Sequence, residues 1–245
     1  MRHVPTAVLA IALLAAPVAS AQSSGNGYLF GQPAVRVTLR GGYAHANAGS
    51  DVFDFTTEQL TLRKRDFSSL TGGLTVAHPF SERFDLGVDA DFALARHGSE
   101  FRKFVDNSDK PILQTTEFKR TPVLVAARFN LVPAGRSVGR LAWIPAGVVP
   151  WLGAGAGATW YKFTQSGDFI DFQTNRVFRD ELTSEGLALT GMGTAGADLS
   201  LSPRLALSAG ARYLWAKGSL SNDFAGFERL DLSGVSATVG LTVRL

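Results

Sequence analysis

Apolar and polar residues alternate along most of this chain with a period of two. The clearest stretch is 84–95, where Phe84, Leu86 and Val88 alternate with Asp85 and Asp89. Successive side chains of a β-strand point to opposite faces of the sheet, whereas the faces of a helix repeat every 3.6 residues. The alternation therefore predicts a strand with one apolar and one polar face.

Eight segments of this kind follow one another, at residues 34–44, 68–77, 84–95, 116–131, 148–163, 186–201, 205–216 and 235–245. The faces of 148–163 stay unassigned, because Gly153, Gly155 and Gly157 interrupt the pattern. Alternating segments of about ten residues in series are typical of transmembrane β-barrels, and an even number of strands permits closure. We predict an all-β fold: a single antiparallel up-and-down transmembrane β-barrel of eight strands, covering 34–245.

The connections between the segments differ in length. Residues 78–83 and 202–204 are short, whereas 45–67, 97–113, 162–183 and 217–229 are long. Short turns at one end and long loops at the other are typical of outer-membrane barrels. The connection 132–145 is long on the short-turn side, which leaves room for a ninth or tenth strand. Aromatic residues near strand ends are expected at the membrane interfaces, namely Tyr43, Trp143, Trp151, Trp160, Tyr161, Tyr213 and Trp215.

The N-terminus has the pattern of a secretory signal peptide. Arg2 precedes an apolar run at 7–19, and Ala19, Ser20 and Ala21 form a small-residue cleavage site. The run is too short to span a bilayer. We predict a signal peptide at 1–21, a short lead-in at 22–33, and an exported mature protein.

Composition excludes several classes of site. The sequence contains no cysteine, so it offers no lipoprotein anchor, disulfide or thiolate ligand. After the leader, no apolar run reaches the length of a transmembrane helix. The net charge of +3 comes from basic residues scattered along the chain, which does not favour a nucleic-acid partner.

The last predicted strand carries the most specific signal. Thr238, Gly240, Val243 and Leu245 match the polar, glycine, hydrophobic, hydrophobic spacing by which barrel-assembly machinery recognises a terminal strand. With these residues and the strand series, the mature region resembles small outer-membrane β-barrel families such as OmpX-like and OmpW-like proteins. The resemblance implies a monomer in the bacterial outer membrane, in contact with lipid and lipopolysaccharide. Those families usually end on an aromatic residue, and Leu245 departs from that.

The polar faces of the predicted strands carry charges of both signs: Arg36, Arg40, Asp85, Asp89, Asp91, Arg128, Asp198 and Arg212. An eight-stranded barrel is just wide enough inside to be filled by side chains, and buried charges must be paired. We therefore predict a salt-bridged plug in the lumen. The alternative is a proton or ion path through the carboxylates.

Two long connections share a short pattern. Asp51, Phe53, Asp54 and Phe55 occur in the first, and Asp168, Phe169, Asp171 and Phe172 in the third. The echo is consistent with a duplicated half-barrel, and we expect these phenylalanines to pack together at the loop rim. The acids could instead bind Ca²⁺, although no EF-hand spacing accompanies them. No cofactor site is predicted.

Three functions remain open. The leading one is a structural or surface-interaction barrel without turnover. The second is a narrow pore or a carrier of small hydrophobic molecules, as the OmpW-like resemblance implies. The third is a lipid A-modifying enzyme, for which His97 and Ser99 are the sole support, because a serine nucleophile needs a base within hydrogen-bonding reach. A soluble secreted barrel is a further alternative, because alternation does not decide which face is outside.

Overall fold

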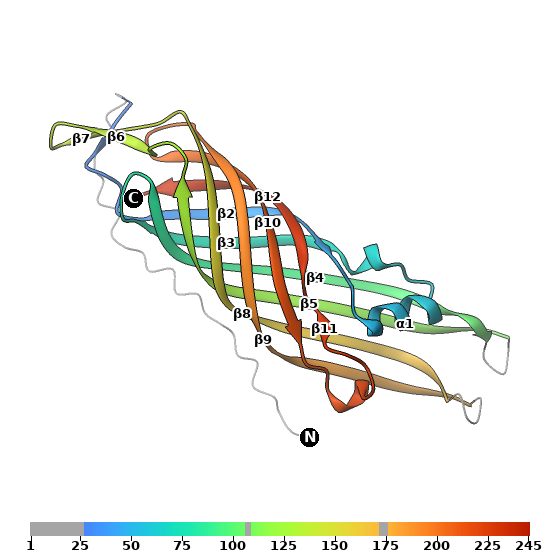
Figure 1. Ribbon diagram of the computed structural model, residues 1–245. Helices are drawn as coiled ribbons and strands as arrows, with labels where there is room; N and C mark the ends of the chain where they lie inside the picture. Colours follow the sequence, from blue (N-terminus) through green and yellow to red (C-terminus); the bar gives the residue numbers. More distant parts are fainter. Residues whose placement is uncertain (1–26, 106–108, 172–175) are drawn as a thin grey trace, which may run out of the picture.

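The computed structural model describes residues 27–105, 109–171 and 176–245. The predicted signal peptide and Phe172 lie outside these residues. Eight long strands form a closed antiparallel ring in the order β10, β12, β2, β3, β4, β5, β8, β9, and β9 pairs with β10 to close it (Figure 1). Their bounds are β2 (Arg36–Ala46), β3 (Ser69–Pro79), β4 (Phe84–Val105), β5 (Pro111–Asn130), β8 (Val148–Asp171), β9 (Arg176–Ser200), β10 (Leu205–Gly218) and β12 (Gly234–Arg244). The predicted eight-stranded up-and-down barrel is confirmed.

The apolar face of the wall points outward. Leu39, Leu70 and Leu189 are 67%, 79% and 89% exposed, whereas the alternate positions are buried, with Asp89 at 5% exposure. A water-soluble barrel would have the opposite arrangement, since exposing this much apolar surface to water is unfavourable. The outer surface is therefore suited to lipid, which answers the question that the alternation left open.

The glycine-rich strand β8 now has assigned faces. Gly153, Gly155 and Gly157 fall on the inward positions, in phase with the buried Tyr161 and Phe163. A β-carbon on Gly155 would lie 2.9 Å from the carbonyl oxygen of Val125 and 3.2 Å from the methyl group of Met192. Small residues are thus needed on this part of the inner wall.

Three of the predicted interface aromatics lie elsewhere in the structure. Tyr43 and Trp215 are half exposed on the outer surface, as expected. Trp151 and Tyr161 point inward instead, and Trp143 is buried outside the ring. The sequence could not distinguish them, because the strand that holds Trp151 and Tyr161 lacked a readable alternation.

Two connections predicted as loops, 97–113 and 162–183, are mostly strand, so those predictions were wrong. β4 and β5 pair as far as Val105 and Pro111, and β8 and β9 pair as far as Asp171 and Arg176. These strands have 20 to 25 residues, whereas about ten cross the bilayer. Beyond the lipid neither face must be apolar, so the alternation fades while the backbone pairing continues.

The remaining long connections fold over the same end of the barrel (Figure 1). The first contains α1 (Asp51–Gln59) and η1 (Lys64–Phe67), and the last contains η2 (Asn222–Phe224) and β11 (Leu230–Asp231). α1 buries Val52, Phe53 and Thr56, which share one face of the helix. In the described part of the chain, no helix has the length and hydropathy to cross a membrane.

The opposite end carries a small sheet outside the ring. β6 (Gly135–Val138) and β7 (Ala142–Pro145) form a hairpin, and β1 (Leu29–Phe30) pairs with β7. The long connection on the short-turn side thus holds two extra strands, as its length allowed, but neither joins the barrel wall. Trp143 of β7 is buried, and the guanidinium of Arg244 lies over its ring, 5.7 Å from the ring centre.

We expect a charge on the lipid-facing wall to be costly. Val239 is outward-facing and half exposed at the middle of β12, paired with Gly41 and Ala209. Val239→Arg should destabilise the barrel by about 2–4 kcal/mol, because arginine would enter hydrocarbon. Urea titration of folding into phospholipid vesicles measures this cost. Val239→Leu, which stays apolar, serves as the control, and equal stability of the two variants would contradict the lipid-facing assignment.

Candidate functional site

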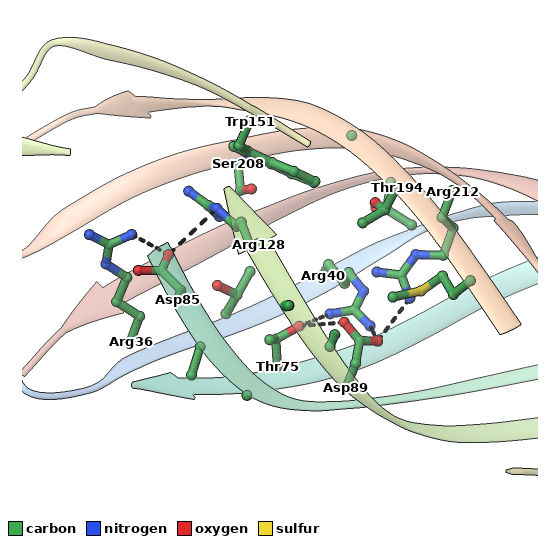
Figure 2. A pocket seen from close by; sticks show the side chains of 18 residues that line it. Arg36, Arg40, Thr75, Asp85, Asp89, Arg128, Trp151, Thr194, Ser208 and Arg212 are labelled. Carbon is green, nitrogen blue, oxygen red and sulfur yellow. Dashed lines mark hydrogen bonds and ion pairs between the residues drawn. The ribbon is translucent and has the colours of Figure 1, made fainter. Parts of the chain in front are cut away.

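The charged residues of the inner wall form two clusters. The first surrounds Asp85, whose Oδ2 accepts a hydrogen bond from Arg36 Nη1 at 2.7 Å and lies 3.6 Å from Arg128 Nε. Arg128 also pairs with Asp198 through Nη2. Four strands, β2, β4, β5 and β9, each contribute one of these side chains. Figure 2 shows three of them, Arg36, Asp85 and Arg128.

The second cluster lies further toward the long loops. Arg40 bridges Asp89 and Asp91, with its Nη2 2.8 Å from Asp91 Oδ1. Arg212 bridges the same two carboxylates from the other side of the lumen, with its Nη1 2.9 Å from Asp89 Oδ1. The Thr75 hydroxyl donates to Asp89 Oδ2 at 3.0 Å. Figure 2 shows Arg40 and Arg212 on either side of Asp89.

Uncharged side chains complete the first cluster. The Trp151 indole N–H and the Ser208 hydroxyl donate to Asp198 Oδ1 at 3.1 and 2.7 Å. The Arg128 guanidinium also stacks over the Trp151 ring, 4.7 Å from its centre. Asp198 is thereby surrounded by donors, which offsets the cost of burying its charge.

All eight residues that alternation placed on one polar face therefore lie together inside the barrel. Sequence reasoning missed Trp151, because the faces of its strand were unassigned. It also omitted Arg120 and Arg244 from the charged set. Both fall on the alternate positions of β5 and β12 that point inward. A cavity of about 80 Å³ remains among the charged side chains.

An aromatic core fills the barrel between the charged clusters and the long loops. Phe53, from α1, inserts its ring among Phe67, Phe118 and Phe163, at centroid distances of 4.6, 5.4 and 5.6 Å. Phe163 also contacts Phe224 of η2 at 5.4 Å. Edge-to-face pairs of this kind stabilise a core beyond simple area burial. The loops thus close the barrel with their own side chains.

The expected packing of the two echoed loop motifs is corrected by this core. Phe53 packs inside the barrel and not against Phe169, which stacks on Phe178 at 6.0 Å. Phe55 contacts Phe227 at 5.4 Å. The two motifs adopt different structures, since the first begins α1 and Asp168, Phe169 and Asp171 are part of β8. Phe172 lies outside the described residues.

The rim acids make local contacts. Asp51 accepts a hydrogen bond from the Glu228 backbone N–H at 3.0 Å, and Asp54 forms an ion pair with Lys64 at 2.6 Å. Gln114 donates its side-chain amide to the backbone carbonyl of Asp168. Across residues 27–105, 109–171 and 176–245, no group of three or more His, Asp or Glu side chains is arranged to hold a metal ion.

An apolar pocket of about 100 Å³ lies at the loop end, beside the aromatic core, whose Phe224 also lines it. Phe55 of α1, Phe101 of β4, Phe169 of β8 and Phe227 of the last loop line it, together with Leu182 of β9. Its wall thus comes from α1, β4, β5, β8, β9 and the last loop, and includes both echoed motifs. The long connections enclose a space that apolar atoms could occupy.

His97 and Ser99 do not form a hydrogen-bonded pair in the described structure. The Ser99 hydroxyl is buried and donates to the Gln114 carbonyl at 3.4 Å, whereas His97 is exposed. Ser99 lines an open cleft of about 820 Å³ between the two extended hairpins, beside Arg96 and Glu181. A hydroxyl that donates to a carbonyl has no base to activate it.

The four residues of the predicted assembly signal occupy the last strand. Thr238 and Gly240 take inward positions of β12, and Leu245, directly after the end of β12, is 65% exposed. Val243 pairs with Val37 and Leu205 in the closed ring. Recognition by the assembly machinery stays a prediction.

A closed ring of strands that is apolar outside and charged inside is the architecture of proteins that cross the outer membrane of bacteria. The chain has the fold of a small membrane-spanning β-barrel. No protein-family model matches its sequence, and no curated protein is similar enough to count as a relative.

Several solved outer-membrane barrels are similar to this one. They include OprG from Pseudomonas aeruginosa, with 13% identity, a TM-score of 0.47 and coverage of 89% of this chain and 99% of that chain. Neisserial surface protein A has 14% identity, a TM-score of 0.43 and coverage of 86% and 96%. Ail of Yersinia pestis has 17% identity, a TM-score of 0.42 and coverage of 87% and 99%.

Breaking one ion pair of the first cluster should be more costly than removing both partners. Arg36→Met leaves Asp85 facing Arg128 alone, and we expect a loss of about 3–5 kcal/mol because the buried carboxylate loses the closer of its two arginine partners. The double variant Arg36→Met, Asp85→Leu should recover part of that loss. Urea unfolding of all four proteins gives the coupling energy. Simple additivity would show that the pair does not stabilise the lumen.

Proposed function

We propose that this protein is a closed structural barrel that holds its long loops and extended hairpins at the cell surface for contacts with other molecules. The observation that carries the proposal is the double filling of the lumen, by ion pairs in one part and by phenylalanine rings in the other. A solute would have to displace both to pass.

The ionic part resists opening because its charges are mutually dependent. Arg40 and Arg212 each contact both Asp89 and Asp91, so moving one side chain leaves others unpaired. Unpaired buried charges are expensive in a low-dielectric interior. The remaining cavity of about 80 Å³ has room for a few water molecules and no continuous column.

The surface role is supported by what extends beyond the lipid. The β4–β5 and β8–β9 hairpins continue past the ends of their neighbours, and most of their outward positions are polar. We propose that this end contacts lipopolysaccharide and surface partners. The closed ring exposes no unpaired wall strand, which supports a monomer inserted by the barrel-assembly machinery. No catalytic step is assigned to Ser99.

Planar bilayer recording tests the closed lumen. The purified barrel should insert without stepwise conductance, because the ion pairs and aromatic rings leave no continuous water path. A wide porin in the same bilayer provides the positive control. Reproducible conductance steps from the wild-type barrel would overturn the closed-barrel proposal in favour of a narrow pore.

A second candidate function is binding of small hydrophobic molecules at the loop end. The pocket lined by Phe55, Phe101, Phe169 and Phe227 supports it, because an apolar enclosure of this size suits a single aromatic ring. This site lies outside the lumen, so binding there does not require a channel.

The pocket can be tested with fluorobenzene by fluorine NMR of the barrel in lipid nanodiscs. We expect a bound signal that is absent from empty nanodiscs and lost in Leu182→Trp, whose indole would fill the pocket. Leu187→Trp is the matched control, because Leu187 is 73% exposed on the outer wall. A signal that is unchanged in Leu182→Trp would contradict binding at this site.

A further inference from the structure

Two buried arginines of the inner wall, Arg120 and Arg244, have no ion pair among the described residues, and Arg120 is the one that lies near the second cluster. Arg120 of β5 is 5% exposed, and its Nη1 donates to the backbone carbonyl of Leu232 at 3.1 Å. Its guanidinium lies 4.9 Å from the centre of the Phe118 ring. Within the described residues, no carboxylate lies within ion-pairing distance of Arg120. Asp231 of β11, in the last loop, is a negative group that acts on it from further away. A neutral carbonyl and a ring face offset only part of the cost of burying this charge.

The barrel interior as a whole carries more positive than negative groups. Inward-facing arginines of the described strands are Arg36, Arg40, Arg120, Arg128, Arg212 and Arg244, and inward-facing buried aspartates are Asp85, Asp89, Asp91 and Asp198. Arginine keeps its charge in proteins. All four aspartates are already paired, so the excess positive charge has no counter-charge in the wall.

A small cavity adjoins the unpaired arginine. It has a volume of about 20 Å³ and is lined by Arg120, Arg212 and Asp91, with Thr71 and Ser236 among the other lining residues. A space of this size holds one water-sized species and excludes phosphate, sulfate and organic acids. The cavity separates the second ion-pair cluster from the aromatic core.

We propose that this cavity binds a single monoatomic anion, chloride in the natural setting, between the guanidinium groups of Arg120 and Arg212. The anion supplies the counter-charge that the wall lacks. Asp91 opposes it, but its two carboxylate oxygens are bound by Arg40 and Arg212, so its charge is already compensated. The site goes beyond the surface role proposed above and does not depend on it.

Bromide, which scatters anomalously, tests the site directly in the wild-type protein. Crystals grown or soaked in sodium bromide should show an anomalous peak in the cavity, within hydrogen-bonding reach of the Arg120 guanidinium. A cavity that holds only water in high bromide would overturn the proposal. This measurement needs no variant, so it stays decisive if substitutions at Arg120 prevent folding.

Stability provides a second test in solution. Chloride is raised from about 10 to about 300 mM in place of gluconate, at constant ionic strength. For an anion that binds in the millimolar range, the equilibrium constant of unfolding should fall about tenfold. Gluconate carries the same single charge as chloride, so it keeps the ionic screening equal. It is too large to enter the cavity, so it cannot replace chloride there. Urea titrations of the barrel in vesicles report the change.

Two variants identify the arginine responsible. Arg120→Met should abolish the chloride dependence, because the cavity loses its unpaired cation. Arg244→Met is the matched control: Arg244 also lacks a carboxylate partner among the described residues, but it lies at the other end of the barrel beside Trp143, so its loss should leave the chloride dependence intact. A dependence that survives Arg120→Met, or that Arg244→Met removes, would overturn the assignment.

Discussion

The requirement that every backbone polar group in lipid be hydrogen bonded within the protein determines the rest of this structure. It is met by pairing β9 with β10, which leaves no open edge in the wall. Because lipid surrounds the ring, apolar side chains occupy most outer positions there, and the strand period of two then places the charged residues of the alternating segments inside. The charges there have no bulk water, so they must pair with one another across the lumen.

The sequence predicted best the parts that obey this constraint. In β4, three aspartates alternate with apolar residues, and their shared inward face followed from the period alone. The arginine that pairs with each carboxylate could not be predicted from the period, because Arg40 and Arg212 come from distant strands whose register only the closed ring establishes. Prediction failed above the bilayer, where β4, β5, β8 and β9 continue as strands without an apolar face, and in glycine-rich β8, where the inward Trp151 had no polar neighbours to reveal its phase.

The echoed motifs show how far local sequence determines local structure in this chain. Asp51, Val52 and Phe53 begin a helix, whereas Asp168, Phe169 and Ile170 continue a strand. The difference lies in what surrounds each segment. The second motif follows a strand already paired on both sides, so extending the ladder is the simplest continuation. The first follows the short β2, and its helix can bury Phe53 among rings supplied by β5 and β8. Tertiary context outweighs the shared pattern.

The division of the interior into an ionic part and an aromatic part also affects how the chain can change over evolutionary time. A phenylalanine of the aromatic part can be replaced by another large apolar residue in a single step, because packing tolerates swaps that conserve volume. A charged residue that bridges two partners, such as Arg40, has no such single-step route, since its loss removes an ion-pair partner from two carboxylates at once. Descendants of this barrel should therefore diverge quickly beneath the loops and slowly, in coordinated sets, around the ion pairs.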